Sequence, residues 1–213
     1  MNAAFDAELA EGEYDLAIIQ GIPGFYHQFG YHYAIPLENH LNLELHRIDE
    51  AGADGWLLRQ AGLEDIPFLA QQDELYRRSY FLSTGRDEAN WLYLLTHGLE
   101  TEYASEYWIG ENSNGDDQFY ARLPFNGFGE GQIVSEVSEN ISFAGMQALL
   151  TLSKSQAKER GKPYIRFNLH NDSRPGRLAI AAGGQPGRPY AWQAKLPNPL
   201  RLLEKLTPVL EGR

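Results

Sequence analysis

The chain has no cysteine among its 213 residues, and this absence excludes several kinds of chemistry. No disulfide can form, no thiolate nucleophile is available, and no zinc site with cysteine ligands can be built. A reducing compartment fits such a composition best, so we expect a cytoplasmic protein. Long hydrophobic runs are also missing, since no window approaches the ~18 apolar residues that a membrane-spanning helix needs. We therefore expect no membrane partner.

Positive charge is scarce as well. The sequence has 18 Lys and Arg residues against 29 Asp and Glu residues, which gives a formal net charge of −11. That charge would repel a phosphate backbone, and no basic stripe is dense enough to bind one, so nucleic acid is not expected as a partner. An acidic chain could attract a cationic substrate, although net charge relates mainly to solubility. With 43% hydrophobic and 12% aromatic residues, the chain should nevertheless form a packed core.

Hydrophobic periodicity and turn residues predict an ordered series of elements after residue 55. A strand runs to Arg59, Asp65 is positioned to cap a first helix, and a second helix ends before Gly98. Three antiparallel strands follow between residues 106 and 139, then a helix over 142–160 and a strand over 164–170. A short helix and a strand over 189–197 complete the series, and residues 198–213 read as one more helix.

The front of the chain resembles the back of that series. A strand over 14–20, a short helix ending at Gly30 and a strand over 31–36 match the strand, helix and strand after residue 163. Residues 14–37 and 164–197 are thus interpreted as a degenerate repeat whose first copy lacks its front. LNLELHRI, from Leu41, alternates as a half-buried strand does. We predict a partial unit over 1–50, a complete unit over 51–197 and a helix over 198–213 that leads out of it.

Three strings carry a resemblance to a known family: GIPGFYHQFGYHYAIPL, LLRQAGLEDIPFL and PYAWQAKLPNPLRLLEKLTPVLE. They are similar to the GNAT-type N-acetyltransferases of the Eis class, in which two GNAT-like units precede a sterol-carrier-like domain. The resemblance implies an α/β fold with a mixed, largely antiparallel, splayed sheet and flanking helices, preceded by a partial GNAT unit. It also implies a family enzyme that transfers acetyl from acetyl-CoA to a small-molecule or peptide amine, and a homo-oligomer is compatible with it.

The same resemblance points to Tyr26 as the catalytic residue, a proton donor to the departing CoA thiolate. A phenol with an ordinary pKa near ~10 is suited to protonating a basic thiolate. The structural alternative is that Tyr26 only packs with Phe25, Phe29 and Tyr31. In the second copy the matching position is Ala179, so that unit is expected to be non-catalytic.

A site for the CoA pyrophosphate is not recognisable in the sequence. GNAT domains hold this group with backbone amides and paired glycines at the start of the central helix, and here the stretch reads SEVSENISFAG. It offers Glu136 and Glu139 in place of a basic residue. Acetyl-CoA is thus expected as co-substrate of the intact family enzyme, but no cofactor is expected to bind this chain tightly. NGFGEG leads into a strand and predicts a hairpin connection, not a dinucleotide loop.

Other polar groups have alternative explanations that the sequence leaves open. The spacing of His27, His32, His40 and His46 does not favour a metal site, and none is expected. His170–Ser173 could form a hydrolase dyad, but these residues also suit a strand-to-helix turn. Acidic residues on two predicted helices could meet a cationic substrate or form a solvated face, namely Asp73, Glu74, Asp87 and Glu88. The alternative function for the whole chain is a non-catalytic binding or oligomerisation module.

Overall fold

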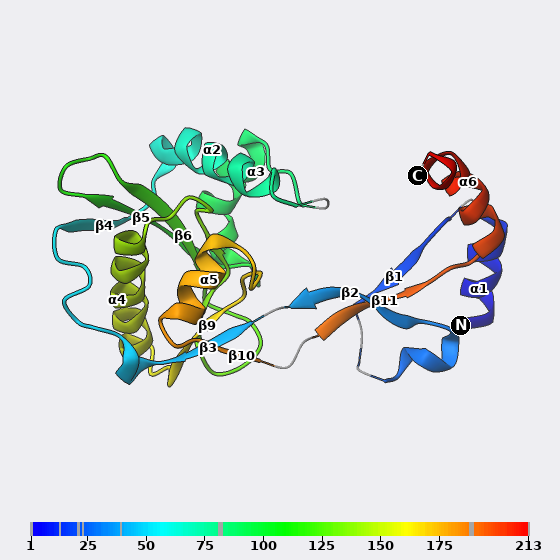
Figure 1. Ribbon diagram of the computed structural model, residues 1–213, viewed down its shortest axis with the longest axis horizontal. Coiled ribbons are helices and arrows are strands. Elements are labelled where there is room, and N and C mark those ends of the chain that lie inside the picture. Colours follow the sequence, from blue (N-terminus) through cyan, green and yellow to red (C-terminus); the bar gives the residue numbers. More distant parts are fainter. Residues whose placement is uncertain are drawn as a thin grey trace. The chain divides into compact units, whose positions relative to one another are not determined.

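The computed structural model describes residues 2–12, 14–20, 22, 24–38, 40–80, 83–187 and 190–212. The chain divides into two compact units, each described by itself below (Figure 1). Unit 1 comprises residues 1–38 and 189–213, and unit 2 comprises residues 39–188. Within the described residues, no helix has the length and apolar character needed to cross a membrane.

Unit 2 is built on two four-stranded sheets that share one interrupted strand. The first sheet has the order β4-β5-β6-β8, with β4 at Trp56–Gln60, β5 at Ser105–Asn112, β6 at Gln118–Pro124 and β8 at Glu136–Val137. The second has the order β10-β3-β9-β7, with β10 at Gln185–Pro186, β3 at Leu41–Glu44, β9 at Tyr164–Phe167 and β7 at Gln132–Val134. Because β7 and β8 follow one another and are separated only by Ser135, the two sheets diverge at this residue.

Most strand pairs in unit 2 are antiparallel, with one parallel pair at the point of divergence. β7 runs parallel to β9, with Val134 opposite Phe167, and the last bond of this pair joins Asn168 N to Val134 O at 2.9 Å. Beyond it, Ser135 N donates to Arg122 O on β6 at 3.0 Å, so the strand stays with β6 and leaves β9. The result is a mixed, largely antiparallel sheet that splays open after residue 134.

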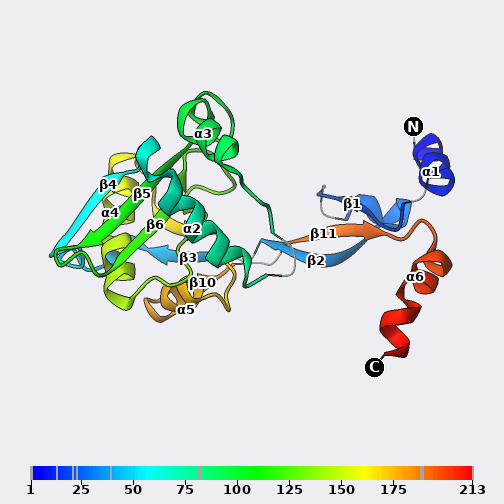
Figure 2. The same ribbon diagram turned by 90° about the horizontal axis from the view of Figure 1, so that it is seen from above.

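Helices cover both faces of the first sheet (Figure 2). α4, at Phe143–Glu159, packs on one face, where Phe119, Ala121 and Leu123 of β6 join the larger core. The alternate residue Tyr120 points to the other face and joins a second core with Leu69 and Trp91, which come from α2 (Ile66–Arg77) and α3 (Glu88–Thr96). The period-two alternation of β6 thus serves two cores, because both of its faces are buried.

Side-chain caps define the starts of several helices. Ser142 accepts from Gly145 N at the start of α4, and Ser173 accepts from Gly176 N at the start of α5, which spans Arg174–Ala181. Asp65 lies directly before α2 but does not cap it with its side chain, contrary to the sequence-based prediction. Its carboxylate instead accepts two hydrogen bonds from Arg59, at 2.6 and 2.7 Å. These bonds are charge-assisted and therefore stronger than a cap hydrogen bond from a neutral backbone amide.

Unit 1 contains a three-stranded sheet with the order β1-β11-β2, formed by Ala17–Ile19, Tyr190–Lys195 and His32–Glu38. A 3₁₀ helix at Tyr26–Phe29 connects β1 to β2, and Gly30 ends it with φ of +81°, a conformation that favours glycine. α1, at Asn2–Glu11, contributes Leu9 to a small core with Ala17 and Tyr31. α6, at Pro199–Glu211, is held to the unit by ion pairs of Arg201 and Lys205 with Asp15.

In each unit, one inner strand of a sheet comes from a part of the chain that is distant in sequence from the two strands beside it. β11 lies between β1 and β2 in unit 1, and β3 lies between β9 and β10 in unit 2. The boundaries predicted at residues 50 and 197 therefore differ from the observed division. Residues 40–50 join unit 2 because Leu41 and Leu43 pair with Phe167 and Ile165, and residues 190–195 join unit 1 through their pairing with β1 and β2.

Candidate functional site

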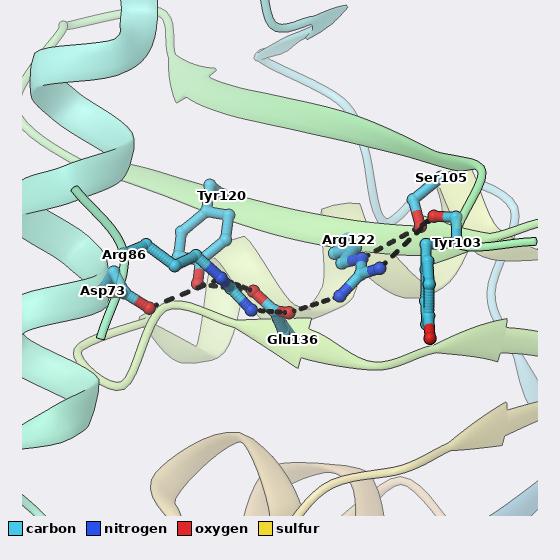
Figure 3. Close-up of polar contacts among 7 residues, drawn as sticks. All are labelled: Asp73, Arg86, Tyr103, Ser105, Tyr120, Arg122 and Glu136. Carbon is cyan, nitrogen blue, oxygen red and sulfur yellow. Dashed lines mark hydrogen bonds and ion pairs between the residues drawn. The ribbon is translucent and has the colours of Figure 1, made fainter. Parts of the chain in front are cut away.

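A chain of buried charged side chains runs between the first sheet of unit 2 and helix α2 (Figure 3). Glu136 lies at its centre and accepts from Arg86 Nη1 and Nη2 at 2.7 and 2.6 Å and from Arg122 Nη1 at 2.9 Å. Arg122 also donates from Nε to Ser105 Oγ at 2.9 Å. At the other end, Asp73 Oδ1 lies 3.4 Å from Arg86 Nη1. Glu136 is thus held by two guanidinium groups, whereas among the described residues Asp73 has one long contact, with Arg86.

Local structure places these side chains on one face. Arg122 and Glu136 are opposite one another on β6 and β8, so their side chains project to the same side of the sheet. Asp73 lies one helical turn after Leu69 on the buried stripe of α2. Arg86 precedes the first turn of α3, and its guanidinium carbon lies 5.0 Å from the centre of the Trp91 ring.

The protonation of the network follows from this geometry. Burial alone would raise the pKa of Glu136, but hydrogen bonds and positive charge from Arg86 and Arg122 outweigh it and hold that pKa at about 2. For Asp73 burial is the largest influence and raises the pKa above its ordinary value. Burial also raises the pKa of Tyr107, to about 12, and Tyr107 lies beneath Arg122 on the next strand. At neutral pH, Glu136 is therefore ionised and neutralised by its neighbours.

A cavity of about 310 Å³ opens beside this network. Its walls come from α2, from the segment before α3 and from the break between β7 and β8. The lining residues are Asp73, Tyr76, Tyr80, Ser83, Thr84, Arg86, Ser135 and Glu136. Since the two sheets diverge at Ser135, the cavity lies at the mouth of the splay, where a ligand can reach strand residues that the sheet would otherwise cover.

Tyr26, the predicted catalytic residue, begins the short 3₁₀ helix of unit 1. Its ring packs edge-on against Phe25, Phe29 and Tyr31, with ring centres 5.0, 6.4 and 6.2 Å away. The side chain is half-buried, and no hydrogen bond to its hydroxyl occurs within the described residues. The aromatic cluster predicted as a structural alternative therefore exists. It packs against the ring of Tyr26 and makes no hydrogen bond to its hydroxyl.

The start of α4 is enclosed by the chain itself. Ser142 Oγ accepts from Gly145 N at 2.8 Å, and a Cβ on Gly145 would lie 3.1 Å from both Ile141 and Phe119. Arg174 Nε donates to Ile141 O at 2.6 Å, and Glu139 Oε1 accepts from Arg174 N at 2.9 Å. Gly145 thus serves close contact with the sheet, and the preceding loop is tied to α5.

Three of the remaining polar residues singled out in the sequence, Ser173, Asp87 and Glu74, have structural partners. The Ser173 hydroxyl donates to the carbonyl oxygen of His170 rather than to its ring, and it caps α5 as the turn interpretation predicted. Asp87 caps α3 through Asn90 N. Glu74 pairs with Arg77 and Arg78 at 3.4 and 3.2 Å, whereas Glu88 is exposed. Within the part of the chain that the structure describes, no three His, Asp or Glu residues gather as metal ligands.

Comparison with known proteins rests on structure alone, since no family model and no curated protein sequence matches the chain. A GCN5-related N-acetyltransferase from Kribbella flavida matches with a TM-score of 0.58 and 13% identity, over 91% of this chain and 47% of that one. Another from Anabaena variabilis matches with a TM-score of 0.53 and 13% identity, over 92% and 50%. A third, from Sphaerobacter thermophilus, has a TM-score of 0.51 and 14% identity, over 86% and 60%. The chain has the GCN5-related N-acetyltransferase (GNAT) fold.

The GNAT fold confirms the fold class predicted from the sequence, a mixed and largely antiparallel sheet with flanking helices. The chain spans about half the length of the first two structures that it matches. At this identity the likeness concerns the fold, and activity has to be argued from residues.

Acetyl-CoA is the co-substrate that the GNAT fold implies, and the start of α4 in unit 2 does not fit its pyrophosphate. The amide of Gly145 is already bonded to Ser142, and Glu139 Oε2 is buried without a hydrogen-bond partner among the described residues. An anion placed there would meet this carboxylate. Glu136 is not the free negative charge that the sequence indicated, because Arg86 and Arg122 neutralise it.

Sequence reasoning missed two features of this region. Arg174 reaches the loop before α4 from α5, although the stretch itself contains no basic residue. The cavity was also missed, because Arg86 and Glu136 are 50 residues apart and only the fold brings them together. The acidic and aromatic run from Asp73 to Tyr80 was the one signal that could have indicated it.

Proposed function

We propose that the chain is part of a GNAT-type N-acetyltransferase of the Eis class, which transfers acetyl from acetyl-CoA to an amine. Tyr26 of unit 1 is the proton donor to the thiolate that acetyl transfer releases, and unit 2 is non-catalytic. The observation that carries this proposal is the position of Tyr26 in a braced short helix between β1 and β2 of a chain with the GNAT fold. At the matching point of unit 2, α5 carries the buried Ala179.

The non-catalytic role of unit 2 is supported by the start of α4. Ser142 occupies the amide of Gly145 in its first turn, and the Glu139 carboxylate lies beside that turn, so a pyrophosphate would meet one amide fewer and a negative charge. Calorimetric titration of the 213-residue chain with acetyl-CoA should give no heat of binding at physiological concentrations of acetyl-CoA. Saturable binding that survives Tyr26→Phe but is lost on Ser142→Trp would contradict the proposal for unit 2.

The role of Tyr26 is tested in the complete protein that contains this chain. Tyr26→Phe should lower the acetylation rate by about 10²-fold or more, the usual contribution of a positioned proton donor. The phenylalanine ring keeps the contacts with Phe25, Phe29 and Tyr31, so thermal stability should not change. Tyr14→Phe is the matched control, since Tyr14 is exposed in the same unit. An unchanged rate in Tyr26→Phe would remove Tyr26 from the mechanism.

A second candidate function, an oligomerisation module, is favoured by α6. Its side facing Asp15 carries Arg201 and Lys205, while large apolar side chains elsewhere on the helix are exposed. These are Leu200, Leu203, Leu206, Val209 and Leu210. Exposed apolar surface of this extent is typical of interfaces. Sedimentation of the wild-type chain and of Leu203→Asp distinguishes the cases: an oligomer that dissociates in the variant supports the module, and a monomeric wild type rejects it.

A further inference from the structure

The dipeptide Asn-Gly occurs twice in the sequence, and both copies lie in exposed connections of unit 2. Asn114 and Gly115 lie between β5 and β6, and Asn126 and Gly127 lie between β6 and β7. In this dipeptide the backbone nitrogen of glycine can attack the side-chain carbonyl carbon of asparagine, because glycine has no side chain to hinder the approach. The dipeptide alone makes the two copies equivalent, whereas the structure distinguishes them.

The first copy is held in a closed turn. Gly115 N donates a hydrogen bond to Asn112 O at 3.0 Å, so the nitrogen that would attack is already engaged. The side chain of Asn112 holds the next residues as well, because its Oδ1 accepts from Asp116 N at 3.1 Å and from Asp117 N at 3.2 Å. Attack on Asn114 would require this turn to open, and each hydrogen bond lost on the way slows the reaction.

The second copy has no such restraint. Phe125 N, directly before the dipeptide, donates to Ala104 O at 3.0 Å. Among the described residues, however, neither the Gly127 N–H nor the Asn126 side chain makes a hydrogen bond. A side chain at Gly127 would overlap Ile133, so the fold requires glycine here. The fold therefore keeps the reactive dipeptide and leaves its glycine nitrogen unbonded within the described part of the chain.

We propose that Asn126 is a site of spontaneous deamidation in the folded protein. The nitrogen of Gly127 loses its proton to solvent base and attacks Asn126 Cγ, so that a new C–N bond closes a cyclic imide and the side-chain nitrogen leaves as ammonia. Water then opens the imide at either of its two carbonyl carbons, which gives aspartate or isoaspartate. Both products add a negative charge between β6 and β7, and isoaspartate also lengthens the backbone there. The proposal goes beyond acetyl transfer and does not depend on it.

The test incubates the whole 213-residue chain at pH 8 and 37 °C and locates the products by peptide mapping with mass spectrometry. Asn126 should be converted about fivefold faster than Asn114 or more, the rate factor that corresponds to ~1 kcal/mol for one hydrogen bond. Asn126→Gln should remove the products at this position, because glutamine would have to close a larger ring. Equal conversion of the two asparagines, faster conversion of Asn114, or no conversion of Asn126 would overturn the proposal.

Two further measurements show whether the fold causes the difference. In urea that unfolds the chain, the turn at Asn112 is lost, and the two asparagines should react at similar rates. A preference for Asn126 that persists unchanged in urea would come from the neighbouring sequence and would reject the structural argument. Asn112→Ala removes the acceptor for Asp116 N and Asp117 N, so it should raise the rate at Asn114 and leave the rate at Asn126 unchanged. An unchanged rate at Asn114 in this variant would equally count against the argument.

Discussion

Replacing Glu136 by Gln should lower the free energy of unfolding strongly, and the pKa of Glu136 gives the size of the effect. The pKa of Glu136 is about 2 in the folded protein against an ordinary value of 4.5, and each pKa unit corresponds to ~1.4 kcal/mol. The carboxylate therefore stabilises the fold by about 3 kcal/mol at neutral pH. The same change leaves Arg86 and Arg122 buried without their partner, and the ~3–5 kcal/mol that broken buried pairs cost agrees with this figure.

The assay is thermal unfolding followed by circular dichroism. For a chain of this size 1 kcal/mol shifts Tm by ~2–4 °C, so Glu136→Gln should lower Tm by about 6–12 °C at pH 7. Glu130→Gln, which removes the same charge from an exposed position, is the control and should have little effect.

The pH dependence of this effect has a definite sign. A carboxylate whose pKa is depressed by folding contributes stability above its unfolded pKa and loses it as pH falls towards the folded value. The difference between wild type and Glu136→Gln should therefore narrow by roughly 2 kcal/mol between pH 7 and pH 3. A Tm of Glu136→Gln equal to that of the control, or a difference that does not change with pH, would refute the electrostatic reasoning.

The remaining predictions concern the two sheets of unit 2. Gly110→Ala should destabilise by ~1–3 kcal/mol, because the new Cβ would overlap the buried ring of Phe119, whereas Gly98→Ala has room and should be nearly neutral in the same melting assay. Leu43→Ala should cost ~2–5 kcal/mol and lower the unfolding temperature recorded by near-ultraviolet circular dichroism, because Leu43 is fully buried against β9. Leu57→Ala, at a 62% exposed position, is its control, and equal effects of the two changes would contradict the placement of β3.

Much of the fold was predictable from the sequence because the signals are local. The alternation of Leu41 and Leu43 indicated a strand, Gly30 and Gly161 ended helices with positive φ, and Ser173 capped α5. The antiparallel pairing of β5, β6 and β8 was predicted as well, but the pairing of strands that are distant in the sequence was not. β3 and β11 each insert between strands from another part of the chain, and periodicity gives the face of a strand but not its neighbours.

The candidate sites show the same difference between local signals, which the sequence carries, and contacts between distant residues, which it does not. Tyr26 could be proposed from a short string, and the structure gives its ring contacts but leaves its chemical role a prediction. Asp65 was misread as a cap because Arg59, six residues earlier, competes for its carboxylate. The neutralisation of Glu136 depends on guanidinium groups 14 and 50 residues away, and no local pattern reports such contacts.

The buried network and the cavity are physically coupled. In proteins generally, replacing a buried ion pair by apolar side chains of similar volume is often neutral or stabilising, so stability alone does not account for the network. Glu136, however, fixes Arg86, which precedes α3, to β8, and residues of both segments line the cavity together with Asp73. Arg86 bonded to Glu136 cannot neutralise Asp73 at the same time. The ion pair of Arg86 with Glu136 therefore ties the segment before α3 to the first sheet of unit 2.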